Sequence, residues 1–405
     1  MKEASAGHGV DAELSYYILY LPITQAKNTA MMKLERRQCA MRPDSIPKKL
    51  EQAGFEAYYV GGCVRDALLG RPVHDWDITT SARPEQIMAL FSHCVPTGLQ
   101  HGTVTVFDGG ACAEVTTFRK DGAYHDSRHP DGVTFVSDLQ EDLARRDFTI
   151  NAMALDLRGR LTDCFGGQDD LRRGVIRCVG TPARRFQEDA LRMLRAMRFS
   201  AQLGFSIAEP THLAIEACAP LCATLSKERV SEETQKTLLS PNPALLSQMI
   251  SLGLLAACNL EGHYDLFWLS TLPCQIDIRW AALRVLIPTL DLRGFRLPAA
   301  RVRLAEAAAA AYRPAYTRLE LKRLIANTGE DTARVCAALA GCAPLLDEIL
   351  SSGECVSLRT LAVTGRDFPA LSGKAVGAAL HALLEHVLEH PEDNDRQTLL
   401  SLAMH

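Results

Sequence analysis

The sequence predicts an α+β fold in which a sheet near the N-terminus is followed by a long helical region. Before residue 120, short runs such as "TVTVF" and "CAEVTTF" are rich in β-branched residues and separated by glycine turns, which is typical of strands and hairpins. Beyond about residue 210, Ala- and Leu-rich amphipathic segments such as "RVRLAEAAAAAYRP" are punctuated by prolines, which is typical of helices. The chain has 405 residues, 47% of them hydrophobic and 23% charged, which is enough for two or more domains.

The first distinctive segment is "YYVGGCVRDALLGRP", residues 58–72. An apolar run ends at Val60, and Gly61-Gly62 then provides a turn in which no Cβ keeps a ligand away from the backbone. Residues 63–69 are predicted to be helical, because Gly70 and the proline after it are a typical helix stop. Backbone N–H groups at the start of such a helix favour a phosphate ligand.

The next segment, "HDWDITT", predicts a strand with two acids on one face. Side chains alternate along a strand, so Asp75 and Asp77 project together, roughly 6.5–7 Å apart, while Trp76 points into the opposite layer. Two such carboxylates are suited to Mg²⁺ held jointly with the phosphates of a substrate. The alternative is a strand end that carries two solvated acids.

A third acid, Glu114, stands in the predicted hairpin "TVTVFDGGACAEVTTF". It can join the aspartate pair if its strand lies beside the strand of Asp77. The alternative is an acid at a strand end without a partner.

At this point the residues resemble a known family. G-G-x-V-R-D followed by D-x-D is similar to the head domain of the nucleotidyltransferase superfamily related to polymerase beta. Its class II branch contains the tRNA CCA-adding enzymes and bacterial poly(A) polymerases, and the resemblance covers roughly residues 45–240. It implies that Gly61, Gly62 and Arg65 bind the nucleotide.

The resemblance also implies a domain order. We expect a mixed-sheet nucleotidyltransferase head over residues 45–180, then a helical neck that recognises the base over 181–250. A helical body and tail that bind tRNA would follow over 251–405. Residues 1–44 match nothing in the family, and they are either an accessory extension or the result of a start codon assigned too far upstream.

A second motif is "DLARRDFTINAMALD", residues 142–156. Asp147 and Asn151 are four apart, so on a helix they would share one face, with Arg146 beside them. In the family this element is associated with the ribose of the nucleotide. The alternative is an arginine–aspartate pair that only ties two elements together.

The third motif, "RRFQEDALRMLRAMRF", suggests how bases could be chosen without a template. Asp189 and Arg192 are three apart, which on a helix makes them neighbours. Asp only accepts hydrogen bonds and Arg only donates them, so the pair suits an amino group beside a ring acceptor, as in cytosine and adenine. Uracil and guanine would place a carbonyl against the acid. In the family, this element is assigned the role of a protein template, with Glu188 and Arg195 as support, although an amphipathic helix alone would show a similar pattern.

Two further segments resemble the same branch. "SKERVSEETQKTLL", residues 226–239, resembles an element whose Arg and Glu brace the neck helices, here Arg229 and Glu232. The charged segment 119–136 is predicted to be a long surface loop, as in relatives that add the terminal A.

Composition adds weaker constraints. The formal net charge is −4, yet residues 145–198 contain twelve arginines against seven acids, which predicts a local RNA path. None of the thirteen cysteines forms a C-x-x-C pair, so we expect reduced, mostly buried thiols and a cytoplasmic protein. No run approaches the length of a transmembrane helix.

Together, the motifs imply Mg²⁺-dependent transfer of CMP and AMP from CTP and ATP to the 3′ end of tRNA. Asp75 and Asp77 would hold the metal, and pyrophosphate would leave. The run "TGLQHGTV" favours the CCA-adding type. An enzyme that adds only A, a poly(A) polymerase, and an inactive homologue that only binds RNA remain alternatives.

Overall fold

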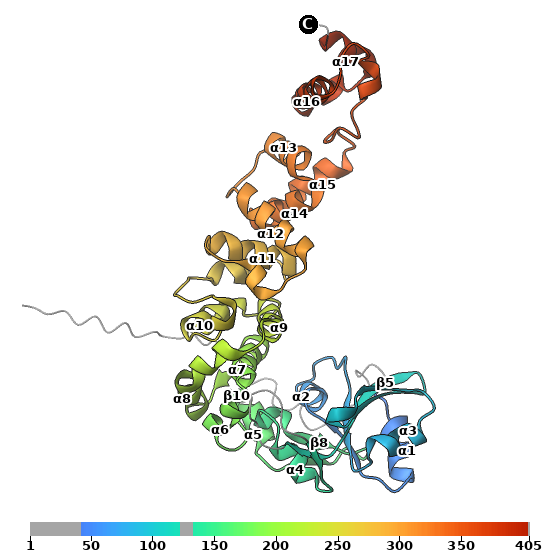
Figure 1. Ribbon diagram of the computed structural model, residues 1–405, viewed down its shortest axis with the longest axis vertical. Coiled ribbons are helices and arrows are strands. Elements are labelled where there is room, and N and C mark those ends of the chain that lie inside the picture. The colour runs from blue at the N-terminus through green and yellow to red at the C-terminus, as the bar shows by residue number, and fades with distance from the viewer. Residues whose placement is uncertain (1–41, 122–132, 404–405) are drawn as a thin grey trace, which may run out of the picture.

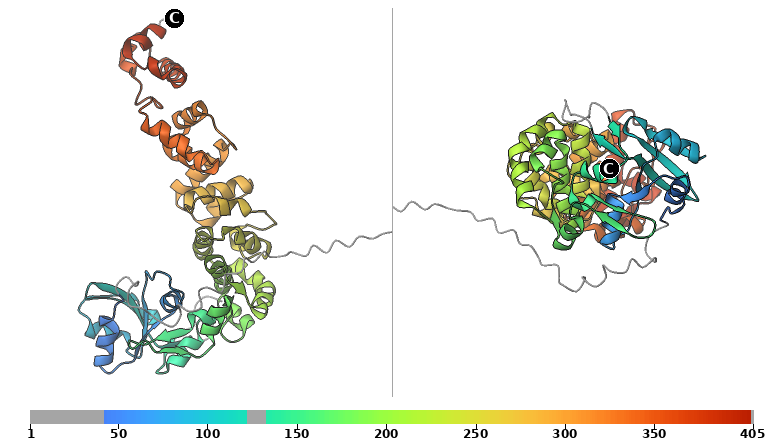
Figure 2. Two further views of the ribbon diagram at one scale, coloured as in Figure 1. Left: turned by 180° about the vertical axis from the view of Figure 1, so that it is seen from behind. Right: turned by 90° about the horizontal axis from the view of Figure 1, so that it is seen from below.

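The computed structural model describes residues 42–121 and 133–403. A compact head that contains the main sheet lies at one end, and a long rod of helices rises from it and ends with α17 (Arg396–Leu402) (Figure 1). The view from behind shows the same bent shape, and the view from below, along the rod, shows the head beside the foot of the rod (Figure 2). Residues 1–41 of the predicted N-terminal extension lie outside the described residues.

The head is built on a seven-stranded sheet in the order β3-β4-β5-β2-β1-β8-β9. Only β2 and β5 run parallel, and the other neighbours are antiparallel, so the predicted mixed sheet is confirmed. The strands are β1 (Ala57–Val60), β2 (Asp77–Thr80), β3 (Cys94–Gly98), β4 (Thr103–Asp108), β5 (Ala111–Thr117), β8 (Met153–Leu155) and β9 (Leu161–Asp163). The predicted hairpin is the β4–β5 pair.

Helices cover the two faces of this sheet differently. On one face, α1 (Ser45–Gln52) and α3 (Pro84–Leu90) bury Ile46, Leu50 and Ile87 against alternate strand residues such as Val104 and Val115. On the other face, α4 (Leu139–Ala144) packs its two buried leucines against Val60, Phe118 and Ala154. This second face is also the face of Asp77, since Thr79, two residues further along β2, donates a hydrogen bond to Asp142 of α4.

The two ends of segment 119–136, which was predicted to be a surface loop, are strands rather than loop. β6 (Arg119–Asp121) and β7 (Val133–Phe135) pair antiparallel, so the two ends of the segment form a hairpin. Residues 122–132 between them lie outside the described residues.

The chain beyond residue 210 is helical, as predicted, and the helices already begin at residue 167, apart from the short parallel pair β10 (Val175–Ile176) and β11 (Ser206–Ile207). The helices are α5 (Gly167–Arg173), α6 (Pro182–Glu188), α7 (Leu191–Leu203), α8 (Glu209–Cys218), α9 (Lys227–Leu238), α10 (Leu246–Ser251), α11 (Ile276–Leu286), α12 (Ala299–Ala311), α13 (Arg318–Thr328), α14 (Glu330–Leu339), α15 (Ala343–Ser351), α16 (Lys374–Glu389) and the terminal α17. None of the helices within the described ranges is long and apolar enough to cross a bilayer.

Two hydrophobic cores divide the rod. One continuous core extends from Ile46 in the head to Ile349 in α15. A second, smaller core extends from Cys355 to Leu399 and belongs to α16, α17 and the loops before them. Leu319 and Ala326 of α13 pack on this second core, and Arg323 of α13 forms ion pairs with two glutamates of α16.

The cysteines differ partly from the prediction. All twelve in the described residues are free thiols, but Cys112, Cys164 and Cys274 are exposed rather than buried.

Candidate active site

The turn between β1 and α2 (Gly62–Leu68) is built around a glycine. Gly61 has φ +75° and ψ −135°, in the region that residues with a Cβ rarely adopt. A Cβ on Gly61 would lie 3.0 Å from Nη1 of Arg146 and 3.5 Å from Oδ2 of Asp77. Gly61 thus lets the backbone approach the point at which the Arg146 guanidinium and the Asp77 carboxylate come together.

The predicted acids meet at the centre of the sheet. β2 begins at Asp77, and because β2 lies beside β5, Asp77 stands directly opposite Glu114. Asp75 is exposed just before the strand, and Trp76 is buried edge-on against Tyr59, with ring centroids 5.1 Å apart. Three carboxylates from two segments far apart in sequence therefore lie near one another.

The carboxyl group of Asp77 has a raised pKa. Burial is the largest influence and raises its pKa, Arg146 opposes this, and repulsion from Glu114 and Asp75 adds to it, so that the pKa reaches about 6. A cation between the carboxylates would relieve that repulsion. Within the described residues, no three or more His, Cys, Asp or Glu side chains form a group that could hold a metal by itself. Carboxylate oxygens are nevertheless hard donors that fit Mg²⁺ shared with a ligand's phosphate oxygens.

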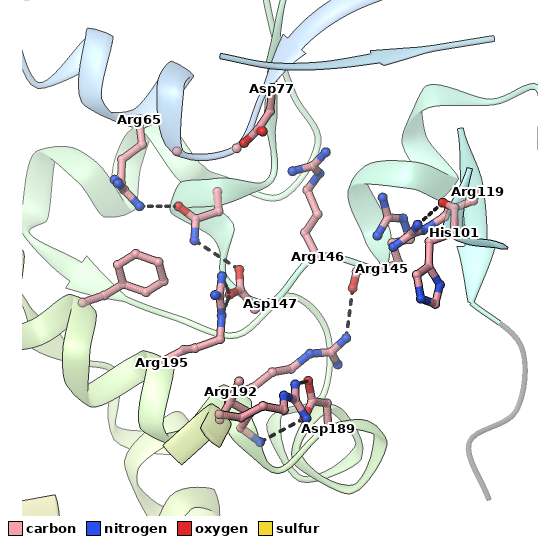
Figure 3. Close-up of a pocket in the computed structure, with 16 residues that line it drawn as sticks. Arg65, Asp77, His101, Arg119, Arg145, Arg146, Asp147, Asp189, Arg192 and Arg195 are labelled. Carbon is pink, nitrogen blue, oxygen red and sulfur yellow. Dashed lines mark hydrogen bonds and ion pairs between the residues drawn. The ribbon is translucent and has the colours of Figure 1, made fainter. Parts of the chain in front are cut away.

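The predicted ribose-binding residues form a hydrogen-bonded chain between head and neck. Arg65 donates to Oδ1 of Asn151 at 2.8 Å, and Nδ2 of Asn151 donates to Asp147 at 3.1 Å. Asp147 also accepts a hydrogen bond from Nε of Arg195 on α7 at 2.8 Å (Figure 3). Burial pushes the pKa of Asp147 upward, but Arg195 and the hydrogen bonds outweigh it and lower the pKa to about 2.

The prediction that Asp147 and Asn151 share a helix face is wrong, although they are neighbours. α4 ends at Ala144, and 149–151 form a 3₁₀ turn. The Asp147 carboxylate accepts a hydrogen bond from the backbone N–H of Phe148 at 2.8 Å, so a side chain satisfies a group that a helix would otherwise use.

The prediction of one helix through Asp189 and Arg192 is wrong for a similar reason. α6 ends at Glu188 and α7 begins at Leu191, while Asp189 between them is extended, with φ −150° and ψ 105°. Its carboxylate accepts a hydrogen bond from the N–H of Leu191 at 3.0 Å, which fixes the start of α7. Both side chains nevertheless line the same cavity.

Each member of this pair has a partner of opposite charge. Arg192 donates to Glu188 at 2.7 Å, and Glu188 also accepts from Arg185 at 2.8 Å. Asp189 accepts from Nη2 of Arg229 on α9 at 2.7 Å. Glu188 and Arg229 thus hold the two side chains in place.

Glu232 does not join helices. Its exposed carboxylate pairs with Lys236 of the same helix at 2.6 Å. The buried acid on this helix is the next residue, Glu233, which forms an ion pair with Arg198 of α7. The predicted brace therefore lies one residue further along the chain.

These residues surround a cavity of 680 Å³ between head and neck. Asp77 lines one end of the cavity, and we call Asp77 together with the neighbouring Asp75 and Glu114 the acid end. We call the other end, lined by Asp147, Asp189, Arg192 and Arg195, the arginine end. The cavity lining within the described residues includes seven arginines and three aspartates, an excess of positive charge that suits a triphosphate. The lining residues are Gly61, Gly62, Arg65, Asp77, His101, Arg119, Arg145, Arg146, Asp147, Asn151, Asp189, Leu191, Arg192, Arg195, Phe199 and Arg229.

Five lining residues were not predicted. His101 stands in the run "TGLQHGTV", and Arg145 is next to the predicted Arg146, so both had some signal. Arg119 donates to the carbonyl of His101, a contact between distant segments. Leu191 and Phe199 resemble ordinary core residues of α7 in sequence.

Phe199 has a distinctive environment. Its ring lies under three guanidinium groups, with the Cζ atoms of Arg198, Arg65 and Arg195 at 3.9, 4.9 and 5.4 Å from the centroid. Arg65 comes from the head, whereas Arg195 and Arg198 come from the neck. The Phe199 ring therefore contacts guanidinium groups from both the head and the neck.

Comparisons with known proteins agree with this architecture. Residues 57–177 match the Poly A polymerase head domain, and residues 204–262 match the probable RNA and SrmB-binding site of polymerase A. The CCA-adding enzyme of Lactobacillus delbrueckii subsp. bulgaricus is 49% identical over 248 residues, an alignment that spans 60% of this chain and 63% of that relative.

Other relatives align over nearly the whole chain. The CCA-adding enzyme of Limosilactobacillus fermentum is 38% identical over 401 residues, which is 92% of this chain and 98% of that protein. The crystal structure of the Bacillus stearothermophilus CCA-adding enzyme in complex with CTP superimposes with a TM-score of 0.78 at 37% identity, covering 90% of this chain and 98% of that one. The chain therefore belongs to the family of CCA-adding enzymes, and the Poly A polymerase head domain forms its N-terminal part.

Proposed function

We propose that this chain adds CCA to the 3′ end of tRNA, transferring CMP and AMP from CTP and ATP without a nucleic-acid template. The observation that carries this proposal is one cavity lined by Asp77 at one end and by Asp189 and Arg192 at the other. The relative from Bacillus stearothermophilus, similar over 90% of this chain, was crystallised with CTP. We expect the reaction to take place in the cytoplasm. We also propose that residues 45–180 form the head, residues 181–250 the neck, and residues 251–405 the body and tail.

At the acid end, Asp75 and Asp77 would hold Mg²⁺, with Glu114 beside them as the third carboxylate. The bound metal would neutralise phosphate charge and make the RNA 3′-hydroxyl a better nucleophile. The hydroxyl loses its proton to solvent, its oxygen forms a bond to the α-phosphorus, the bond from the α-phosphorus to the bridging oxygen breaks, and pyrophosphate leaves. No covalent enzyme intermediate is required.

Between the two ends, the cavity would fix the sugar and the phosphates. Arg146, beside Asp77 and Gly61, is placed to neutralise the triphosphate. Arg65, Asn151 and Asp147 form a hydrogen-bonded chain that would hold the ribose, and Arg195 keeps Asp147 ionised. Positioning of this kind is the main means by which a phosphoryl-transfer site accelerates its reaction.

At the arginine end, Asp189 would accept the amino group of cytosine or adenine while Arg192 donates to the neighbouring ring nitrogen. A carboxylate has about four acceptor sites, so Asp189 keeps capacity beyond its bonds to Leu191 and Arg229. Uracil and guanine would bring a carbonyl oxygen against this carboxylate, leaving a buried acceptor without a donor. Glu188 and Arg229 would keep the pair in position.

The test is extension of a tRNA transcript that ends just before CCA. CTP alone, ATP alone and both together are supplied with Mg²⁺, and an unstructured RNA is tested in parallel. We expect ordered addition of C, C and A, after which addition stops. A single A added only to tRNA ending in CC would instead indicate an A-adding enzyme, and long A tails on the unstructured RNA would indicate a poly(A) polymerase. No addition under any condition would indicate a homologue that only binds RNA.

A further inference from the structure

The face of the sheet that carries the catalytic acids continues beyond them onto the edge strands. In the in-register row, Asp77 of β2 lies opposite Glu114 of β5, Glu114 opposite Thr105 of β4, and Thr105 opposite Val95 of β3. Directly paired residues point to the same side of a sheet. The row thus runs from the acid end of the cavity to the edge of the head.

Side-chain contacts confirm that these residues share a face. The hydroxyl oxygens of Thr97 and Thr105 are 2.9 Å apart, which joins β3 to β4, and those of Thr103 and Thr116 are 3.0 Å apart, which joins β4 to β5. On β2, Thr79 on the same side contacts α4. Helix α4 therefore covers this face near the centre of the sheet, where Val60 and Phe118 are buried.

Toward the edge, the same face is open within the described part of the chain. Val95 is 50% exposed and Phe107 47% exposed, while Cys112, opposite Phe107, and Glu114 are also exposed. The alternate residues of these strands, such as Val104, Val106 and Val115, are fully buried against α1 and α3. We call the surface formed by Val95, Thr97, Thr105, Phe107, Cys112 and Glu114 the open sheet face.

The open sheet face has the chemistry of a surface for single-stranded nucleic acid. Its outer part offers an exposed aromatic ring, an aliphatic side chain and threonine hydroxyls, which suit bases and sugars. Its inner part ends at carboxylates, where a reacting hydroxyl is needed and a phosphate would be repelled. Three strand spacings separate β2 from β3, about 14 Å, which accommodates several stacked nucleotides at about 3.4 Å each.

From this continuity we infer that the open sheet face holds the last unpaired nucleotides of the RNA acceptor end, with a base stacked on Phe107. This inference rests on the proposed function, because it identifies the place of the RNA at the same reaction centre. It leaves the arginine-rich cavity to the incoming nucleotide, so the two substrates approach the acid end from different sides.

Cys112 provides a native probe of this surface. The intact protein is treated with iodoacetamide, and the alkylation rate of each cysteine is followed by peptide mass spectrometry. A hairpin RNA with an acceptor stem and three unpaired nucleotides at its 3′ end should slow alkylation of Cys112 at least about fivefold, while the exposed Cys164 serves as internal control. The same RNA shortened by its last three nucleotides, or CTP alone, should give no protection.

The outcomes separate this inference from the proposed function. RNA that is bound and extended while Cys112 reacts at its free rate would overturn the inference and leave the proposed function intact. Protection of Cys112 without RNA that grows with protein concentration would also overturn it, because the surface would then be a contact between copies of the chain. Failure of the wild-type protein to extend any RNA would remove the proposed function, and the inference with it.

A substitution gives an independent measurement. Phe107→Ser should raise the KM for the hairpin RNA about tenfold, within the roughly five- to 150-fold range of aromatic base stacking. The KM for CTP should change less than about twofold, and Phe107→Tyr should restore the wild-type value because it keeps the ring. Phe267→Ser is the matched control, since Phe267 is 69% exposed but lies in the helical rod. An unchanged KM for RNA in Phe107→Ser would contradict the stacking contact.

Discussion

The acid end and the arginine end of the cavity treat an aspartate in opposite ways. At the acid end, burial and neighbouring carboxylates raise the pKa of Asp77 to about 6, despite Arg146. At the arginine end, Arg195 and hydrogen bonds lower the pKa of Asp147 to about 2 although the side chain is buried. We therefore propose that a ligand from outside completes the first end, whereas the protein's own charges hold the second end together.

The largest expected effect is on activity at the acid end. Asp77→Asn should reduce nucleotide addition at least roughly a thousandfold, because it removes a charged ligand of the proposed metal. Its free energy of unfolding without metal should be equal or higher, since a repelled charge is removed. Single-turnover extension and urea denaturation measure the two quantities. Glu85→Gln, at an exposed position of α3, is the control, and activity within tenfold of wild type in Asp77→Asn would refute the assignment.

The next effect is on stability at the contact between α7 and α9, which lies outside the cavity lining. Glu233→Gln leaves the buried guanidinium of Arg198 without its carboxylate, so we expect the free energy of unfolding to fall by about 3 kcal/mol. Its neighbour is the matched control, because Glu232→Gln breaks only an exposed pair with Lys236 and should cost less than about 0.5 kcal/mol. Urea denaturation of the two variants compares them directly. Equal losses would mean that Glu233 does not brace α7.

The opposite pKa shifts predict opposite pH dependences. Because the pKa of Asp147 is lowered in the folded state, its ionisation contributes about 2 kcal/mol of stability above pH 4, lost as the pH falls toward 2. The stability difference between wild type and Asp147→Asn should therefore shrink over that range. For Asp77, whose pKa is raised, the stability advantage of Asp77→Asn over wild type should grow between pH 4 and 6. Urea midpoints measured across this pH range test both, and parallel curves would contradict the comparison.

The smallest effect concerns base choice. Asp189→Ala should lower the preference for CTP and ATP over UTP and GTP about tenfold, because no carboxylate then opposes the carbonyl of the wrong base. Competition assays with all four nucleotides measure this ratio. The control is Asp147→Asn, which should weaken the binding of all four nucleotides alike, since we propose that Asp147 binds the sugar. Unchanged selectivity in Asp189→Ala would rule out a protein template at this position.

Features that depend on residues close together in the sequence could be predicted, whereas contacts between residues far apart in the sequence could not. The α+β order and the positive-φ glycine at 61 follow from local patterns, and the structure has both. The place of Glu114 beside Asp77 depends on which strands pair, and the hairpin signal alone left this open. Phe199 and His101 join the cavity only through tertiary contacts.

Two kinds of error have identifiable causes. Helical periodicity suggested single helices through Asp147 and Asp189, but each side chain accepts a hydrogen bond from a nearby backbone N–H, and there the chain is not helical. The prediction of Glu232 as a brace did not take into account which face of α9 is buried. Its buried positions Val230, Glu233, Thr234 and Thr237 follow the spacing of a helix face, a pattern that was present in the sequence.

The separate core of α16 and α17 gives the far end of the rod a mechanical property of its own. Head, neck and body share one continuous apolar core, so a force on any of them is transmitted through close packing. The last part is joined to α13 through a small apolar contact and the exposed ion pairs of Arg323. Dissolved salt screens such pairs. We therefore expect the joint between α13 and α16 to become less stiff as the salt concentration rises, while the single core keeps the rest of the rod rigid.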